Sequence, residues 1–278
     1  MAKKLIIMAL GAAFLFSACE VNEPIYDTSH PEQGQIIKLT TDWTAIGTGI
    51  SIPPTYTVKV GGYSAQLTGQ SNTIDNLFAS GTYSVSIYNT ADHVTVSGTA
   101  ATANYTSGFP GWLFTSVTSL TIEKDADHEF TAVMNQQVRE LNLVIEPTGS
   151  TIDKITSLSA TLSGVASTVD FANNTHSNAV SIAPAFIKQA DGKYKATVRL
   201  LGIIGQEQKL SLTVTFANNS PAPITQEMNI HTQLGNFNAD KKTPLTLGAQ
   251  TVETTSESGF TATITDWTKV TGGTGTAN

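Results

Sequence analysis

The residue best placed for covalent chemistry is Cys19, the only cysteine among the 278 residues. It follows a basic start, Lys3-Lys4, and an apolar run, Leu5–Phe16, that is too short to span a bilayer as a stable helix. This pattern is typical of an export signal that is removed from the mature chain. No disulfide can form within the chain, so the thiol is free for modification where the mature protein would begin.

The segment Phe16-Ser17-Ala18-Cys19 resembles the bacterial lipobox, in which small residues precede a cysteine that receives diacylglycerol. Phe16 departs from the leucine that is commoner at that place. We expect residues 1–18 to be a lipoprotein signal peptide and Cys19 to be the lipidated N-terminus. No later stretch of the sequence approaches the length of a spanning helix, so the lipid is the expected membrane contact.

Other residue groups have little of the spacing that a reactive site needs. The five histidines are scattered, and none has a second ligand two or four residues away: His30, His93, His128, His176 and His231. The polar segment Asp125–Glu129 lacks the glycine and the distal glutamate of a calcium loop, which favours a solvated hairpin over a metal site. Nucleophile elbows and phosphate-binding loops are missing from the sequence. We expect no catalytic residue, metal or cofactor, and therefore no enzyme.

Exposed aromatic side chains are a second candidate for binding. Trp112 follows Phe109 in the apolar, turn-rich segment 108–114, where a loop position would let both contact a sugar or a partner protein. Burial in the core is the equal alternative for Trp112. Trp43 and Trp267 lie at expected strand ends, which favours the core for both.

The charge of the chain argues against nucleic acid. Its formal charge is −7, and loss of Lys3 and Lys4 with the signal makes the mature chain more negative by two charges. An acidic surface repels phosphate backbones. Residues 19–34 contain acids, prolines and turn formers without a period, which indicates an extended tether.

Alternation of apolar with polar residues dominates the chain after the tether and predicts strands with one dry face. The clearest runs are Tyr56–Val60, Tyr83–Tyr88, Phe130–Val133, Leu141–Ile145, Tyr194–Leu200 and Leu210–Phe216. Gly61-Gly62 and Asp191-Gly192 have the composition of hairpin turns. The segment from Ile152 to Leu162 can be read as a helix or as a strand, and its Thr and Ser content favours a strand. We expect an all-β fold.

The length of the strand-rich region predicts two domains rather than one. We place the N-terminal β-sandwich at residues 35–136 and the C-terminal β-sandwich, with its Gly/Thr-rich tail, at 137–278. A Gly-x-Tyr strand recurs once in each half, at Gly81–Ile87 and Gly192–Val198.

These features together resemble the fimbrillin and fimbrial-anchor lipoproteins of Bacteroidales bacteria. The resemblance rests on the lipobox, the tether, the paired Gly-x-Tyr strands and, most specifically, the segment Val138–Ala166. It implies two tandem antiparallel transthyretin-like sandwiches and a lipid-anchored place at the outer membrane, facing the cell surface. It also implies fimbrial subunits as partners, joined by β-strand addition at a sheet edge.

Two roles remain open from the sequence. One is the basal anchor or an accessory subunit of a fimbria (pilus). The alternative is an adhesive surface lipoprotein that binds a host protein or a glycan through Trp112 and Phe109.

Processing separates an anchor from a stalk subunit in the family that this chain resembles. There, stalk subunits lose the lipidated leader and first strand when a protease cuts after an arginine in the first domain. The mature sequence has no arginine before Arg139, at the start of the second half. Lys38 and Lys59 remain as sites for a less selective protease. The sequence therefore favours an anchor or accessory subunit over a stalk subunit.

Overall fold

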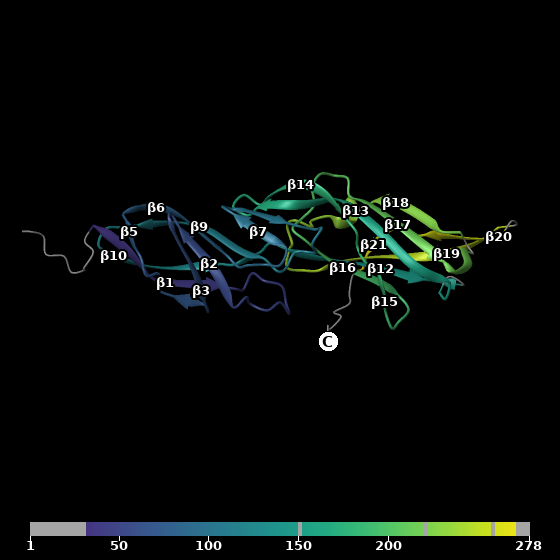
Figure 1. Ribbon diagram of the computed structural model, residues 1–278, viewed down its shortest axis with the longest axis horizontal. Coiled ribbons are helices and arrows are strands. Elements are labelled where there is room, and N and C mark those ends of the chain that lie inside the picture. Colours follow the sequence, from purple (N-terminus) through teal and green to yellow (C-terminus); the bar gives the residue numbers. More distant parts are fainter. Residues whose placement is uncertain (1–31, 150–151, 220–221, 257–258, 271–278) are drawn as a thin grey trace, which may run out of the picture.

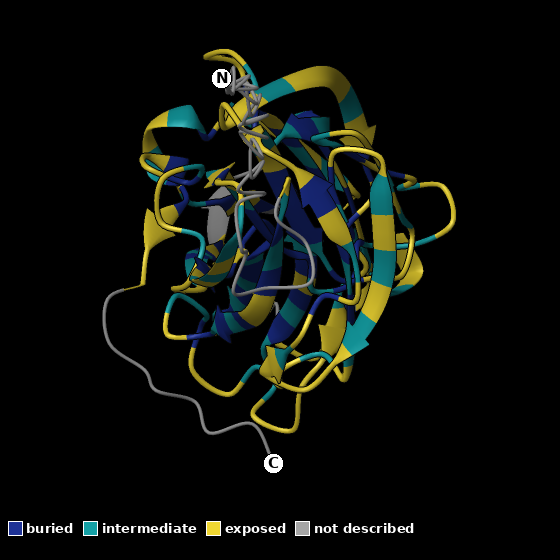
Figure 2. Ribbon diagram, turned by 90° about the vertical axis from the view of Figure 1, so that its left-hand side faces the viewer, coloured by how far each residue is buried: buried dark blue, intermediate teal, exposed yellow. Residues whose placement is uncertain are grey.

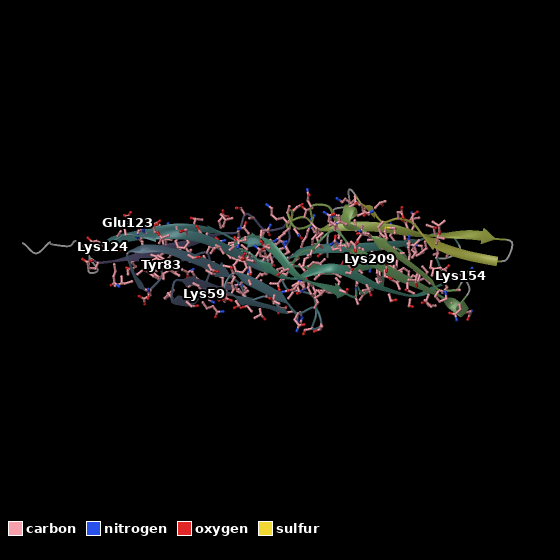
Figure 3. The ribbon with its side chains drawn as sticks, turned by 90° about the horizontal axis from the view of Figure 1, so that it is seen from above. Lys59, Tyr83, Glu123, Lys124, Lys154 and Lys209 are labelled. Atoms are coloured by element: carbon pink, nitrogen blue, oxygen red, sulfur yellow. The ribbon has the colours of Figure 1, made fainter. Side chains whose placement is uncertain are left out.

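The computed structural model describes residues 32–149, 152–219, 222–256 and 259–270. Cys19, the tether before Glu32 and the Gly/Thr-rich tail from Thr271 lie outside these residues. The molecule is elongated, with the earliest strands at one end and β20 at the other (Figure 1). Seen from above, Lys124 lies at the first end and Lys154 near the opposite one (Figure 3).

The first sandwich has two facing sheets. One sheet has the order β10-β1-β4, with β5 also paired to β1, and the other has the order β11-β9-β6-β2-β3. The bounds of the first sheet are β1 Gln33–Asp42, β4 Ser71–Asn72, β5 Leu77–Ala79 and β10 Ala126–Val133. Those of the second are β2 Thr55–Val60, β3 Tyr63–Thr68, β6 Gly81–Tyr88, β9 Phe114–Ile122 and β11 Asn135–Gln136.

The second sandwich is built in the same way. One sheet has the order β15-β16-β12-β19-β20, with β21 also on β19, and the other has the order β18-β17-β13-β8-β7, with β14 on β13. The first has β12 Arg139–Pro147, β15 Ile187–Lys188, β16 Tyr194–Leu200, β19 Leu245–Ser256, β20 Gly259–Ile264 and β21 Thr268–Lys269. The second has β7 Val94–Ser97, β8 Ala100–Ala103, β13 Ile155–Asp170, β14 Thr175–Ile182, β17 Lys209–Phe216 and β18 Ile224–Asn229. Helical turns are η2 Ala217–Asn219 and α1 His231–Leu234.

Each sandwich has its own apolar core, because alternate residues of its strands point between the sheets. The first core includes Ile36, Val58 and Ile87, all fully buried. The second includes Leu143, Val198 and Phe216. Viewed along the molecule, the buried residues lie between the sheets and the exposed ones form the outer faces (Figure 2). The all-β prediction is confirmed.

The hairpin β7–β8 departs from the order of the sequence. It comes from the first half of the chain, yet β8 pairs with β13 through Thr102↔Thr168 and Ala101↔Val169. One sheet of the second sandwich therefore contains a hairpin from the first half of the chain. The division near Gln136 stays a prediction about where one folding unit ends.

Most neighbouring strands in the described residues are antiparallel, as expected from the turn composition. Two pairs among them are parallel: β1 with β10 in the first sandwich and β12 with β19 in the second. In each case the first long strand of the sandwich lies beside a strand from near its end.

The strand β13 settles the ambiguity between Ile152 and Leu162 in favour of a strand. A bulge interrupts its pairing with β14 between Leu162 and Val165. Gly164 lies in this bulge with φ +69°, and a Cβ there would come within 2.7 Å of the Glu207 carbonyl oxygen. A glycine is therefore required for β13 to bend and continue for 16 residues.

Candidate functional site: the first strand and the junction

The first strand, β1, is a central strand of its sheet. It pairs with β10 on one side and with β4 and β5 on the other. Ile36 and Leu39 are fully buried in the first core. Residues just behind the tether are therefore built into the body of the protein.

A bulge in β1 between Ile36 and Lys38 explains why the buried positions are three residues apart. The extra residue, Ile37, is 37% exposed, and Lys38 also faces solvent. The Lys38 ammonium lies 3.3 Å from Glu129 on β10, but both side chains are more than half exposed. This ion pair contributes little to stability. Lys38 is thus exposed at its side chain while its backbone lies within a paired strand.

Backbone hydrogen bonds extend the β1·β10 pairing beyond both ends. Asp125 N–H donates to the Gln33 carbonyl oxygen, and Met134 N–H donates to that of Asp42, each at 2.8 Å. Lys124 and Glu32 form an ion pair at the tether end. The contact between the two strands therefore spans the full length of β1.

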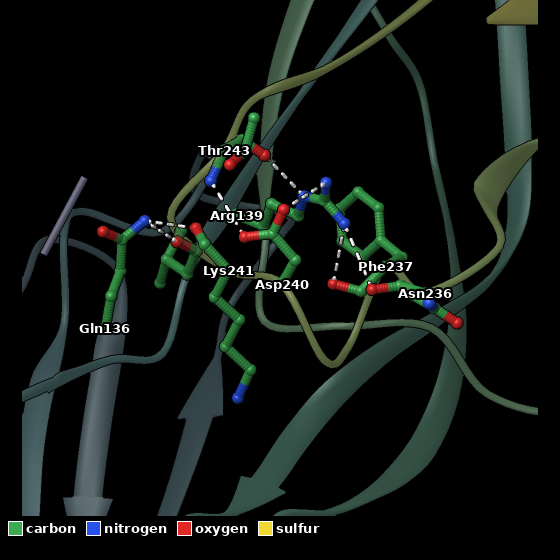
Figure 4. Close-up of polar contacts among 8 residues, drawn as sticks. Gln136, Arg139, Asn236, Phe237, Asp240, Lys241 and Thr243 are labelled. Carbon is green, nitrogen blue, oxygen red and sulfur yellow. Dashed lines mark hydrogen bonds and ion pairs between the residues drawn. The ribbon is translucent and has the colours of Figure 1, made fainter. Parts of the chain in front are cut away.

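The segment between the sandwiches is held by buried glutamines. Gln136, 4% exposed, accepts a hydrogen bond from Gly47 N–H and donates to the carbonyl oxygens of Val138 and Lys241. Gln137 donates from its amide to Thr115 Oγ1 at 2.8 Å. These bonds tie both halves of the chain to one point, and Figure 4 shows the bond from Gln136 to Lys241. The connection is a packed junction rather than a free linker.

Arg139 begins β12 with a buried side chain. Its guanidinium donates to the carbonyl oxygens of Thr243, Phe237 and Asn236 at 2.8, 3.2 and 3.3 Å. Asp240 lies 3.6 Å from it, and the ring of Phe237 stacks at 5.0 Å (Figure 4). Burial lowers the pKa of this guanidinium, and Asp240 opposes that shift. Arg139 fixes segment 236–243 against the start of the second sandwich.

Lys241 is the second cation of the junction, and its ammonium contacts amide oxygens. Its ammonium donates to Gln137 Oε1 at 2.8 Å and to Asn174 Oδ1 at 3.0 Å. It lies beside a polar cavity of about 440 Å³ that Ala45 and Thr115 of the first half also line. Burial lowers the pKa of Lys241 from 10.5 to about 8.

We expect this shift to make stability depend on pH. The unfolded chain binds the Lys241 proton more tightly than the folded chain, so the free energy of unfolding should rise as pH increases from 8 to 10. The rise should be about 1–2 kcal/mol, reduced from the full linkage value because the side chain is partly exposed. Urea unfolding at both pH values measures it. Lys241→Met should remove most of the rise, and an identical rise in that variant would contradict this assignment.

Trp112 and Phe109, the aromatic candidates, lie near the junction and are partly buried. Trp112 packs on the first core and on a small apolar cluster that joins the sandwiches, which includes Leu113, Val138 and Leu201. The guanidinium of Arg199 lies 5.6 Å from its ring centre. Phe109 packs on the second core. This packing gives both residues a structural role, and ligand contact by either stays a prediction. The core positions expected for Trp43 and Trp267 are confirmed, at 7% and 2% exposure.

The polar segment Asp125–Glu129 consists of a turn residue, Asp125, and the first four residues of β10. Asp125 has φ +55°, and His128 Nε2 accepts a hydrogen bond from Glu123 N–H. In the part of the chain that the structure describes, no group of three His, Cys, Asp or Glu side chains could hold a metal ion. Nor does any helix in that part have the length and apolar character needed to cross a membrane.

The junction network was not predicted from the sequence. Its signals are single residues: two adjacent glutamines, and one of the two arginines of the whole chain, Arg139, placed before a strongly apolar strand. A charged residue at the first position of a buried strand needs partners, and that alone could have marked it. The partners lie about 100 residues away in segment 236–243.

The model of the family of fimbrillin-A associated anchor proteins Mfa1 and Mfa2 matches residues 78–272. A comparison with curated protein sequences found no match.

Solved structures share the fold at low sequence identity. A candidate adhesin from Bacteroides ovatus has a TM-score of 0.60 and 11% identity, covering 86% of this chain and 96% of its own. The fimbrial anchor protein Mfa2 from Porphyromonas gingivalis has a TM-score of 0.51 and 13% identity, covering 84% and 97%. A candidate adhesin from Bacteroides thetaiotaomicron has a TM-score of 0.53 and 11% identity, covering 88% and 99%.

Proposed function

Because this chain belongs to the family of fimbrillin-A associated anchor proteins Mfa1 and Mfa2, we propose that it is the basal anchor or an accessory subunit of a fimbria, held in the outer membrane by a lipid on Cys19. The family is fimbrial and structural in kind, and its members act with other fimbrial subunits at the cell envelope. In this role the mature subunit retains both the lipid and the first strand, β1.

The position of β1 is the observation that carries the proposal. Its buried residues Ile36 and Leu39 belong to the first core, and it is paired on both sides. Removing such a strand would expose the core and two rows of unpaired backbone groups, which is costly unless another strand replaces it. A subunit that retains β1 keeps a covalent connection from its body to the lipid.

The distribution of cleavage sites supports retention. Residues 19–138 contain no arginine, and Lys38 is the first lysine after the lipidated cysteine. The Lys38–Leu39 bond lies within β1, so a protease can cut it only in molecules in which this strand has transiently opened. The bond after Arg139 is inside β12, and cleavage there would cut the covalent connection between the sandwiches. Neither site suits the production of a stalk subunit.

Assembly with other subunits is proposed to use strand addition at a sheet edge. Within the described residues, β3 and β18 are outer strands of six residues each, paired on one side. Outer strands present unpaired backbone groups to which an extended segment of a partner can hydrogen-bond. Such contacts would join the anchor to the next subunit without a preformed pocket.

The lipid part of the proposal predicts the behaviour of Cys19→Ala. This variant should move from the membrane fraction to the soluble fraction, because the lipid is the expected membrane contact. Its thermal unfolding should match that of the unlipidated wild-type chain, since residue 19 precedes the strands. Fractionation of the two proteins from the same cells tests this, with Glu20→Ala as the matched control that stays on the membrane. A variant that remains with the membrane would defeat the lipid assignment.

A further inference from the structure

We propose that the parallel pair β1·β10 is a tension clamp that carries pulling force from the lipid tether into the body of the protein. This inference rests on the proposed anchor function for its biological load. The clamp itself follows from strand geometry.

The direction of pull is set by where the chain enters and leaves the pair. The tether enters at the N-terminal end of β1, at Gln33. The chain leaves β10 at its C-terminal end, at Val133, and continues to the junction. Because the strands are parallel, with Gly34 beside Ala126 and Asp42 beside Val133, these two points lie at opposite ends of the pair.

A force between opposite ends acts along the strands and loads the whole ladder together. A force between neighbouring ends would instead act across the strands and break the backbone hydrogen bonds one after another, which is called unzipping. The pairing continues past both ends through Asp125 N–H and Met134 N–H, so the loaded length exceeds the strand itself. On the other side of β1, β5 adds pairing at Gln33–Gln35 and β4 at Leu39 and Thr40, which must also slide. Resistance to rupture is therefore highest for the pull that an anchor experiences.

The path beyond the clamp is also held. Residues 134–138 connect β10 to β12, and Met134 and Val138 within this segment are fully buried. The side chain of Gln136 bonds to backbone groups on both sides of the junction. Force therefore passes into a packed segment rather than a slack linker.

The second sandwich repeats the arrangement. Its first long strand, β12, is parallel to β19, with Leu141 beside Leu245 and Pro147 beside Thr251. A load attached beyond the C-terminal end of β19 would shear this pair in the same sense. The end of β19 lies with β20 at the end of the molecule opposite β5 and β10 (Figure 1). The two parallel pairs thus stand in series along the long axis.

Single-molecule pulling on one fold in two directions tests the clamp. The chain from Cys19 onwards is made without lipid, so that its native thiol is the first handle. The second handle is a cysteine placed by Asn135→Cys, just after β10, or by Glu123→Cys, just before it. Both residues are exposed. Glu123 lies beside Lys124 at one end of the molecule (Figure 3), next to the N-terminal ends of β1 and β10. Pulling on that variant therefore unzips the pair β1·β10.

The first sandwich should rupture at a severalfold higher force with the handle at residue 135 than with the handle at residue 123, at the same pulling speed. Equal thermal unfolding of the two variants is the control, because forced rupture depends on the barrier along the pull and not on equilibrium stability. Equal rupture forces in the two directions would overturn the clamp. The result is independent of the anchor proposal, since the chain tested carries no lipid and no fimbria.

Discussion

Arg139→Ala should lower the free energy of unfolding by about 3 kcal/mol. The substitution leaves three carbonyl acceptors around a vacated buried site and removes the partner of Asp240. Breaking a buried, hydrogen-bonded ion pair costs about 3–5 kcal/mol. The lower end applies here because the Asp240 side chain is 48% exposed and water can solvate it. Urea denaturation of both proteins measures the difference.

Arg199→Ala provides the matched control for that loss. Arg199 is the other arginine of the chain, and it stacks on Trp112 while remaining partly exposed. Its removal should cost about 1 kcal/mol. Hydrogen exchange should localise the effect of Arg139→Ala to segment 236–243 and β12. A loss for Arg139→Ala no larger than that for Arg199→Ala would mean that the buried network does not fix the junction.

Leu39→Ala should destabilise the first sandwich by about 2–5 kcal/mol, because it leaves a cavity at a fully buried position of β1. Its readout is twofold: the free energy of unfolding, and the rate at which trypsin cuts after Lys38. Cleavage there requires β1 to open, so it should become faster in proportion to the lost stability.

The neighbouring variant Ile37→Ala tests whether burial of the side chain, rather than any truncation within β1, causes the loss of stability. Ile37 lies in the bulge of the same strand and is 37% exposed, so its truncation should cost less than about 1 kcal/mol. Cleavage after Lys38 should then stay close to the wild-type rate. Similar losses for the two variants would show that β1 is not held by its buried residues.

Local alternation was sufficient to predict several of the long strands but not their partners. The run Tyr56–Val60 and the run Leu210–Phe216 match β2 and β17 closely, because apolar alternation directly reports a half-buried strand. Alternation does not encode which strand lies alongside. Turn residues favour sequence neighbours and hence antiparallel hairpins, so the parallel pairs β1·β10 and β12·β19 left no local signal.

The junction was hidden for a related reason. The side chains of Gln136 and Arg139 donate to backbone carbonyl oxygens of segment 236–243, about 100 residues away in the sequence, and single polar residues have no period. Trp112 lies in a loop, as its neighbouring glycines and proline predicted. The pairing of the hairpin β7–β8 with β13, however, brings the second sandwich against this loop. That pairing depends on tertiary contacts alone.

The central claim, that this fimbrial protein keeps both its lipid and its first strand, is tested most directly by its N-terminus in assembled fimbriae. Intact mass spectrometry and N-terminal peptide analysis of the protein, isolated with the fimbriae from the outer membrane, give the answer. The account predicts an acylated N-terminus at Cys19, with β1 still attached. A homogeneous new N-terminus after Lys38 or Lys59 would contradict it, because that chain would have lost its anchor and part or all of β1.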